Sequence, residues 1–183
     1  MEFNQSRTFK NLQDAFEGEL KTSTLYEIYG IRARQENYIQ IADVYDIISG
    51  FEREHAIIWY KLLHEGQLPT TLENLTGSAI IEEAKANTTY REYANVAREE
   101  GYTSIAALFD GVANIELNHD VIFQNFANNF ENGEVFCKPR EVLWICINCG
   151  NIMGGTCAPV ICPICGFPQG YYQVYDSNSN SVI

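Results

Sequence analysis

Long stretches of this 183-residue chain repeat apolar residues at alternating steps of three and four, and this pattern limits the fold more than any other feature. Residues spaced in this way form one stripe along an α-helix, and a helix with such a stripe buries it against its neighbours. The pattern predicts helices over residues 8–36, 38–65, 74–99 and 103–131. Each helix would be about 40 Å long at ~1.5 Å per residue. The first 134 residues are therefore expected to form a four-helix bundle.

Two of these predicted helices carry the same polar motif on the stripe that should face inward. The motif is Glu-x-x-His, with Glu52 and His55 in the second helix and Glu116 and His119 in the last. Residues three apart project from the same side of a helix, so each pair offers one carboxylate and one imidazole to a single point. Glu19 interrupts the stripe of the first helix in the same way. A carboxylate buried alone costs several kcal/mol, so the pattern predicts a carboxylate site for two iron or manganese ions.

The cysteines predict a second kind of metal site. Cys146 and Cys149 form one Cys-x-x-Cys pair, and Cys162 and Cys165 form another after twelve intervening residues. Two such pairs indicate one tetrahedral metal bound by four thiolates. A module of about 45 residues buries too little surface to fold alone, so we expect the metal to supply folding energy. Ligation by four thiolates suits zinc and iron alike.

Disulfides are the alternative use of cysteines. The N-terminus shows no basic region followed by an apolar run, so no signal peptide is visible and a reducing cytoplasm is expected. Cys137 and Cys157 lie outside both Cys-x-x-Cys pairs, and we expect them to be free thiols.

Charge and hydropathy exclude two classes of partner. The chain has a formal net charge of −12 without a basic cluster, so it would repel nucleic acid. No run approaches the ~20 apolar residues that a membrane helix needs.

The charge also changes along the chain. The excess of acids lies entirely before residue 136, because Lys138, Arg140, Glu141 and Asp176 cancel one another. All six cysteines lie on the other side of the same point. We therefore predict a helical domain at 1–134, a cysteine domain at 135–176 and a flexible tail at 177–183.

Five runs across the chain carry a resemblance to a known family. They are Asn11–Glu19, Glu52–Ala56, Ala97–Tyr102, Glu116–His119 and Trp144–Cys165. In this order and spacing they resemble rubrerythrin, a ferritin-like di-iron bundle fused to a C-terminal rubredoxin-like domain. The resemblance implies a mainly α fold, with a ferritin-like four-helix bundle and a small β/loop domain that holds iron on four cysteines.

The resemblance also implies a function. It implies one iron on the four cysteines and one or two non-haem irons in the bundle. The expected reaction is reduction of hydrogen peroxide to water, with electrons passed through the cysteine-bound iron. The donor would be rubredoxin or an NAD(P)H-dependent reductase, and the protein would be a homodimer. Two alternatives stay open, an electron-transfer or structural homologue with an inactive bundle site, and a ferroxidase or iron-storage protein.

Roles for single residues follow from the same resemblance. It implies that Glu19 is a terminal ligand and that Glu52 and Glu116 bridge two metals. It also implies that His119 binds one iron and that His55 binds the other. Two tyrosines that match residues just outside the family's ligands are Tyr26 and Tyr102.

The third predicted helix departs from the family pattern. The family places Glu-x-x-Glu there, and an alignment without gaps puts Lys85 and Thr88 at these positions. In one interpretation, Glu82 lies one turn earlier and serves as a substitute ligand. In the other, which we favour, the Lys85 ammonium pairs with Glu52 and Glu116 and takes part of the space of a metal. The second interpretation predicts one bundle metal or a weakly occupied pair, with impaired peroxidase activity.

Overall fold

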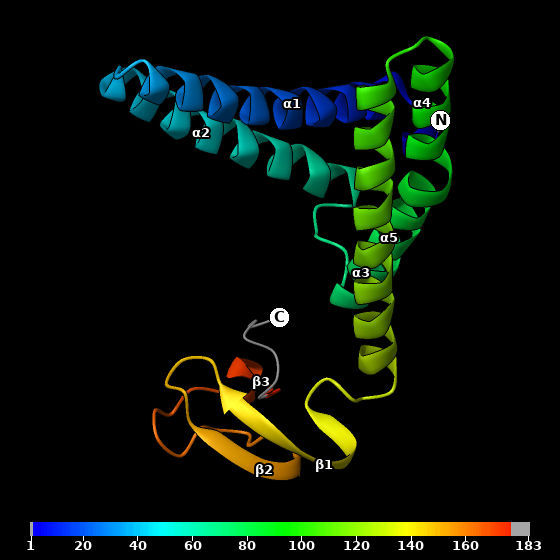
Figure 1. Ribbon diagram of the computed structural model, residues 1–183. Coiled ribbons are helices and arrows are strands. Elements are labelled where there is room, and N and C mark those ends of the chain that lie inside the picture. The colour runs from blue at the N-terminus through cyan, green and yellow to red at the C-terminus, as the bar shows by residue number, and fades with distance from the viewer. Residues whose placement is uncertain (1, 177–183) are drawn as a thin grey trace. The chain divides into compact units, whose positions relative to one another are not determined.

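A computed structural model describes residues 2–176 (Figure 1). The helices are α1 (Arg7–Gln35), α2 (Ile39–Leu63), α3 (Thr71–Ala84), α4 (Tyr90–Glu99) and α5 (Thr103–Glu131). The strands β1 (Cys137–Cys146), β2 (Ile152–Cys157) and β3 (Tyr172–Val174) follow, and short 3-10 helices lie at Phe3–Gln5 and Gln169–Tyr171. The expected mainly helical fold with a small C-terminal strand region is confirmed. The predicted tail at 177–183 lies outside the described residues.

The chain divides into two compact units. The division falls between Pro69 and Thr70. The domain boundary expected after residue 134 falls between the end of α5 at Glu131 and the start of β1 at Cys137, and it stays a prediction. Among residues 2–176, no helix combines the length and the apolar character that crossing a membrane requires.

The first unit is an antiparallel hairpin of α1 and α2. Ser6 caps the start of α1, where its Oγ accepts a hydrogen bond from the backbone N–H of Phe9 at 3.0 Å. The contact face of α2 carries buried small residues seven positions apart, at Ala42, Ser49 and Ala56. Small side chains at this spacing let the two helices approach closely along their length.

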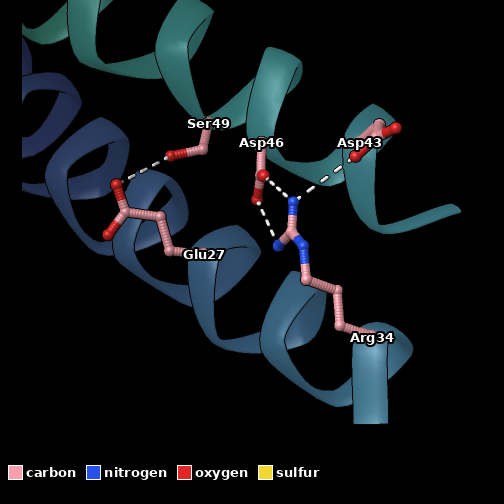
Figure 2. A network of polar contacts seen from close by, with 5 residues as sticks. All are labelled: Glu27, Arg34, Asp43, Asp46 and Ser49. Atoms are coloured by element: carbon pink, nitrogen blue, oxygen red, sulfur yellow. Dashed lines mark hydrogen bonds and ion pairs between the residues drawn. The ribbon is translucent and has the colours of Figure 1, made fainter. Parts of the chain in front are cut away.

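Polar contacts tie the hairpin together at two levels. Near the turn, the Arg34 guanidinium on α1 binds the carboxylates of Asp46 and Asp43 on α2 (Figure 2). Further along, Ser49 Oγ donates to Glu27 Oε1 at 3.4 Å (Figure 2). Ser23 Oγ donates to the Ser49 carbonyl oxygen at 3.0 Å. These contacts add directional bonds to the packing of small side chains.

The second unit begins with the remaining helices. Thr70 and Glu73 form a capping box at the start of α3, with side chain and backbone of each bonded to the other. Both α3 and α4 pack on α5. Gly101, between α4 and α5, has φ +87°, a left-handed conformation that favours glycine and permits the tight turn. Arg91 of α4 then donates to Asp110 Oδ1 of α5 at 3.0 Å.

The third predicted helix is continuous in outline but irregular in winding. A π-helical turn at Lys85–Thr89 joins α3 to α4. A π turn closes hydrogen bonds over five residues and so inserts extra chain into an α-helix. Residues on either side of the turn therefore no longer share the positions that 3.6-residue counting assigns to them. The turn begins directly after α3 ends at Ala84, so Glu82 lies in the last residues of α3 before it.

The strands form an antiparallel sheet in the order β2-β1-β3. Its core contains Trp144, which is fully buried and whose indole N–H donates to the Gly155 carbonyl oxygen at 3.1 Å. Ala158 and Tyr172 pack in the same cluster, together with two of the cysteines. The core is small, as expected for a module of this length.

Cys137 and Cys157 correct one prediction from the sequence. We expected free thiols, but the two residues form a disulfide. They are partners across the antiparallel ladder of β1 and β2, with their Cα atoms 4.0 Å apart. Strand register creates this proximity, and spacing along the chain does not reveal it.

Candidate metal centres

Four cysteine side chains converge at one end of the sheet. Each Cys-x-x-Cys pair ends in a turn that a glycine closes, Gly150 at φ +77° and Gly166 at φ +73°. The N–H of Gly150 donates to the Cys146 carbonyl oxygen at 2.8 Å, and the N–H of Gly166 donates to that of Cys162 at 2.9 Å. The two pairs thus adopt the same turn, which aims both of their sulfurs at one point. The four ligands expected from the sequence are brought together.

The sulfur spacing fits a metal. Cys146 Sγ lies 3.7 Å from Cys165 Sγ, and Cys149 Sγ lies 3.7 Å from Cys162 Sγ. A tetrahedron with metal–sulfur bonds of ~2.3 Å has edges of about 3.8 Å. All four sulfurs lie within 4.8 Å of one another. The residues present therefore fit one tetrahedrally bound ion.

Neighbouring groups favour the thiolate form at Cys162 and Cys165, whereas the pKa of Cys149 is raised to about 12 by burial and by the other three sulfurs. The Tyr172 hydroxyl, which donates a hydrogen bond to the sulfur, is the main cause that lowers the pKa of Cys162 to about 6, against the effect of burial. The backbone N–H of Phe167 lowers the pKa of Cys165. Thiolate is the form that binds metals, so these hydrogen bonds prepare the site for an ion. Asn151 Nδ2 donates to the Tyr172 oxygen at 3.2 Å and fixes the hydroxyl.

A first carboxylate–histidine triad lies within the α1–α2 hairpin. Glu19 of α1 joins Glu52 and His55 of α2, and one ligand atom from each lies within 4.8 Å of the others. His55 Nδ1 is 2.9 Å from Glu52 Oε2 and 3.9 Å from Glu19 Oε1. The two carboxylates are half-buried, and the imidazole is more open. Helical spacing therefore aims these side chains at one point, as the sequence pattern suggested.

A second triad lies on α3 and α5. Glu82 of α3 joins Glu116 and His119 of α5, again with ligand atoms within 4.8 Å. His119 Nδ1 is 2.9 Å from Glu116 Oε2 and 3.5 Å from Glu82 Oε2. The carboxylates are largely buried, with side chains 12–13% exposed. The two triads have the same composition, one Glu from one helix and a Glu-x-x-His from its neighbour.

Glu82 has an unsatisfied oxygen that points to a ligand. Its Oε2 is buried and has no hydrogen-bond partner among the described residues. Its Oε1 is paired with the Lys85 ammonium at 3.1 Å. A hydrogen bond with Glu116 and then the contact with Lys85 lower the pKa of Glu82, although burial opposes them. A buried carboxylate oxygen without a donor is costly, and a cation at this point would remove the cost.

The position of Lys85 differs from our expectation. We favoured an ion pair of this ammonium with Glu52 and Glu116, but within its own unit it pairs with Glu82, on its own helix, in place of Glu116. The nearby charge of Glu116 contributes to raising the pKa of Lys85, after the larger effect of Glu82. Thr88 lies in the π turn and is exposed. The helix thus presents Glu82 to the triad and places the ammonium beside it.

The expected places of two tyrosines near the metals stay a prediction. Tyr26 lies seven residues after Glu19 on α1 and packs on Tyr45, with ring centroids 5.8 Å apart. Tyr102 caps the start of α5 and is 58% exposed. It precedes Glu116 by fourteen residues, or about 21 Å of helix.

Comparisons with known proteins place the chain among relatives. A rubrerythrin family profile matches residues 10–78 and 73–144, and a profile of the rubredoxin-like domain of rubrerythrin matches residues 144–173. Rubrerythrin of Nitratidesulfovibrio vulgaris is 35% identical over 94% of this chain and 96% of its own length. Rubrerythrin of Clostridium perfringens is 37% identical over 93% and 95%. A structure of nigerythrin in a mixed-valence state is 24% identical, covers 93% of this chain and 87% of its own, and has a weak TM-score of 0.35.

Proposed function

Because the chain belongs to the rubrerythrin family, with a ferritin-like helical part and a rubredoxin-like iron domain, we propose that it reduces hydrogen peroxide to water. The observation that carries this proposal is the presence, within the described residues, of three ligand sets in one chain. One is a tetrathiolate suited to electron transfer, and two are carboxylate–histidine triads suited to redox-active iron. The tetrathiolate could deliver single electrons, and the two triads together could hold the pair of irons that a two-electron acceptor needs.

The triads supply the ligands of the proposed peroxide site. These residues would hold iron, which would supply electrons for the cleavage of the oxygen–oxygen bond. Each triad contributes two carboxylates and one imidazole, so its charge of −2 balances one ferrous ion. For the reaction site we keep the roles that the resemblance implies, terminal for Glu19 and bridging for Glu52 and Glu116. We add Glu82 as the ligand that the third helix supplies, supported by its place beside His119.

The residues of the chain have two tasks in this proposal. The carboxylates lie along buried helix stripes, so they hold negative charge in place before a metal arrives and need no rearrangement. The imidazoles of His55 and His119 lie closest to their own Glu-x-x-His carboxylates, and this contact orients each ring.

A second candidate function rests on Lys85. Its ammonium reduces the net charge of the Glu82 triad from −2 to −1 and occupies one oxygen of a proposed ligand. This favours weak occupancy of that triad, and the protein would then transfer electrons through its tetracysteine iron without turning over peroxide. The choice between these functions depends on how many irons the chain binds.

Partners and location complete the proposal. The electron donor would be rubredoxin or an NAD(P)H-dependent reductase, and the compartment would be the cytoplasm. We propose a homodimer on the family resemblance alone.

Metal analysis of protein purified without oxygen, together with a peroxidase assay, tests the proposal. Three irons per chain and turnover of peroxide with a reduced donor support the peroxidase. One iron per chain and no turnover support the electron-transfer function. Glu116→Ala, which removes a ligand from the triad, is the control that separates bundle iron from tetracysteine iron.

A further inference from the structure

We propose that Cys137 and Cys157 form a second redox site, a thiol–disulfide pair that hydrogen peroxide oxidises and a dithiol reductant restores. The two sulfurs are bonded across the β1–β2 ladder. Cys157 is exposed and Cys137 is half-buried, so small oxidants and reductants have access to the pair. In a reducing compartment, a disulfide is usually catalytic or redox-sensing and seldom a permanent crosslink.

This pair is separate from the tetracysteine cluster. Cys146 stands nine residues further along β1 than Cys137, a distance of up to about 30 Å along a strand. The sulfurs of the four clustered cysteines face one another and fit a metal. Oxidation of the pair therefore leaves these four thiolates in place.

The disulfide secures a weak point of the sheet. Between the Cys137–Cys157 pair and the next pair, Val142 with Gly155, regular pairing is interrupted. Four residues of β1, 138–141, stand opposite Thr156, so backbone pairing there is irregular. Beyond the disulfide, the N–H of Ala158 donates to the Phe136 carbonyl oxygen at 2.8 Å. Reduction would leave this end of β1 attached through that hydrogen bond, without a covalent tie.

This end of β1 is also the connection to the helices. Lys138 Nζ, next to Cys137, donates to Asn129 Oδ1 near the end of α5 at 3.1 Å. Cys137 also lines an apolar cavity of about 600 Å³ with Phe126 and Phe130 of α5. The redox state of the pair would thus set how firmly the first residues of β1 are held beside α5.

The chemistry balances with peroxide as the oxidant. The exposed Cys157 thiolate attacks one peroxide oxygen, so a sulfur–oxygen bond forms, the oxygen–oxygen bond breaks and hydroxide leaves, which takes up the proton released from the Cys157 thiol and becomes the first water. The Cys137 thiol then attacks this sulfur, the disulfide forms, the sulfur–oxygen bond breaks and a second water leaves. Two electrons pass from the sulfurs to the two oxygens. A dithiol returns the electrons by thiol–disulfide exchange and is itself oxidised to a disulfide.

Alkylation of the full-length, iron-loaded protein tests the redox site. The protein is reduced with dithiothreitol, freed of reductant without oxygen, treated with a small excess of hydrogen peroxide and blocked under native conditions with N-ethylmaleimide. Mass spectrometry should find both cysteines alkylated before peroxide and joined after it, and a second treatment with dithiothreitol should restore alkylation. A bond that native protein never releases to dithiothreitol, or a dithiol that peroxide never closes, overturns the proposal.

Hydrogen exchange tests the mechanical consequence. The amides of Cys137, Lys138, Arg140 and Glu141 should exchange about tenfold faster in the dithiol form, because their segment opens more often, while those of 143–146 should not change. Equal exchange of residues 137–141 in both forms would overturn the role at this connection.

Variants separate this site from the peroxidase. Cys157→Ser should exchange like the dithiol form whatever the peroxide treatment, and Thr156→Ser, one residue away, should behave as wild type. The inference rests on the proposed function for the compartment and the oxidant. Glu116→Ala should keep the reversible disulfide even if it loses peroxide turnover, so the two proposals fail by different results.

Discussion

Replacing Lys85 by Met should have opposite effects on the metal-free and the metal-bound protein. The ammonium lies 3.1 Å from Glu82 Oε1, while the other oxygen of this carboxylate is buried, 3.5 Å from His119 Nδ1, and has no hydrogen-bond partner among the described residues. Removing the ammonium leaves a largely buried charge without its cation, which destabilises the metal-free form. The same change frees a ligand and removes a positive charge, which favours a divalent metal.

The size of the effect follows from distance and exposure. At 3.1 Å the attraction between two unit charges is about 5 kcal/mol with an effective dielectric constant of ~20. The Lys85 side chain is 39% exposed, so water screens much of this attraction. We expect Lys85→Met to lower the free energy of unfolding of metal-free protein by about 1–2 kcal/mol, between the values for exposed and buried pairs. The midpoint of thermal unfolding should fall by about 2–8 °C.

Metal affinity should change in the other direction. We expect ferrous ion to bind about tenfold more tightly to the bundle of Lys85→Met, which corresponds to about 1.4 kcal/mol. Calorimetry of unfolding measures the first effect, and anaerobic titration of protein with a filled tetracysteine site measures the second. Lys85→Arg keeps the positive charge. It should therefore neither lower the stability of the metal-free protein nor tighten metal binding.

A matched control comes from an exposed pair of the same type. Lys10 lies 2.8 Å from Asp14 on α1, with side chains 66% and 58% exposed. Lys10→Met should leave both the free energy of unfolding and the metal affinity unchanged within error, because water screens an exposed ion pair. If Lys85→Met raises the stability of metal-free protein, or fails to tighten metal binding, the ammonium does not compete with a metal for Glu82.

Three further predictions concern other parts of the chain. Ferric protein should show the visible charge-transfer bands of an iron tetrathiolate, and Cys162→Ala should abolish them and unfold the strand module, as absorption and circular dichroism would show; colourless protein with one zinc would contradict this. Glu116→Ala should reduce bundle iron and leave tetracysteine iron intact in anaerobic metal analysis, whereas unchanged total iron would mean that the triad was already empty. The hydrogen bond from Arg34 lowers the pKa of Asp46 from 3.8, so this contact stabilises the hairpin fully above pH 3.8 and its contribution is lost as the pH falls through the lowered pKa (Figure 2). Asp46→Asn should therefore flatten the acid side of a urea-denaturation series, and an unchanged slope would refute the assignment.

The local spacing of residues was sufficient to predict most helices and the ligand motifs of the protein. The 3-4 stripes predicted the helices to within a few residues at most ends, because amphipathic periodicity is a property of each segment by itself. The Glu-x-x-His and Cys-x-x-Cys motifs likewise indicate which ligands a single turn brings together. Even the place of Glu82 has a local signal, because it continues the stripe of Leu75, Ala79 and Ala86 in steps of four, three and four.

What the sequence could not supply depends on register. Counting back from Ala97–Tyr102 without gaps places Lys85 and Thr88 in the family's ligand positions, and the count does not reveal that both residues lie in a π turn, which changes the faces that they present. Cys137 and Cys157 are twenty residues apart, and the pairing of β1 with β2 decides that they meet. Helical and turn motifs are set by neighbours in the chain, so the sequence by itself determined them. The extra residue in a helix and the partner across a sheet depend on contacts between segments, and only the tertiary structure decided those.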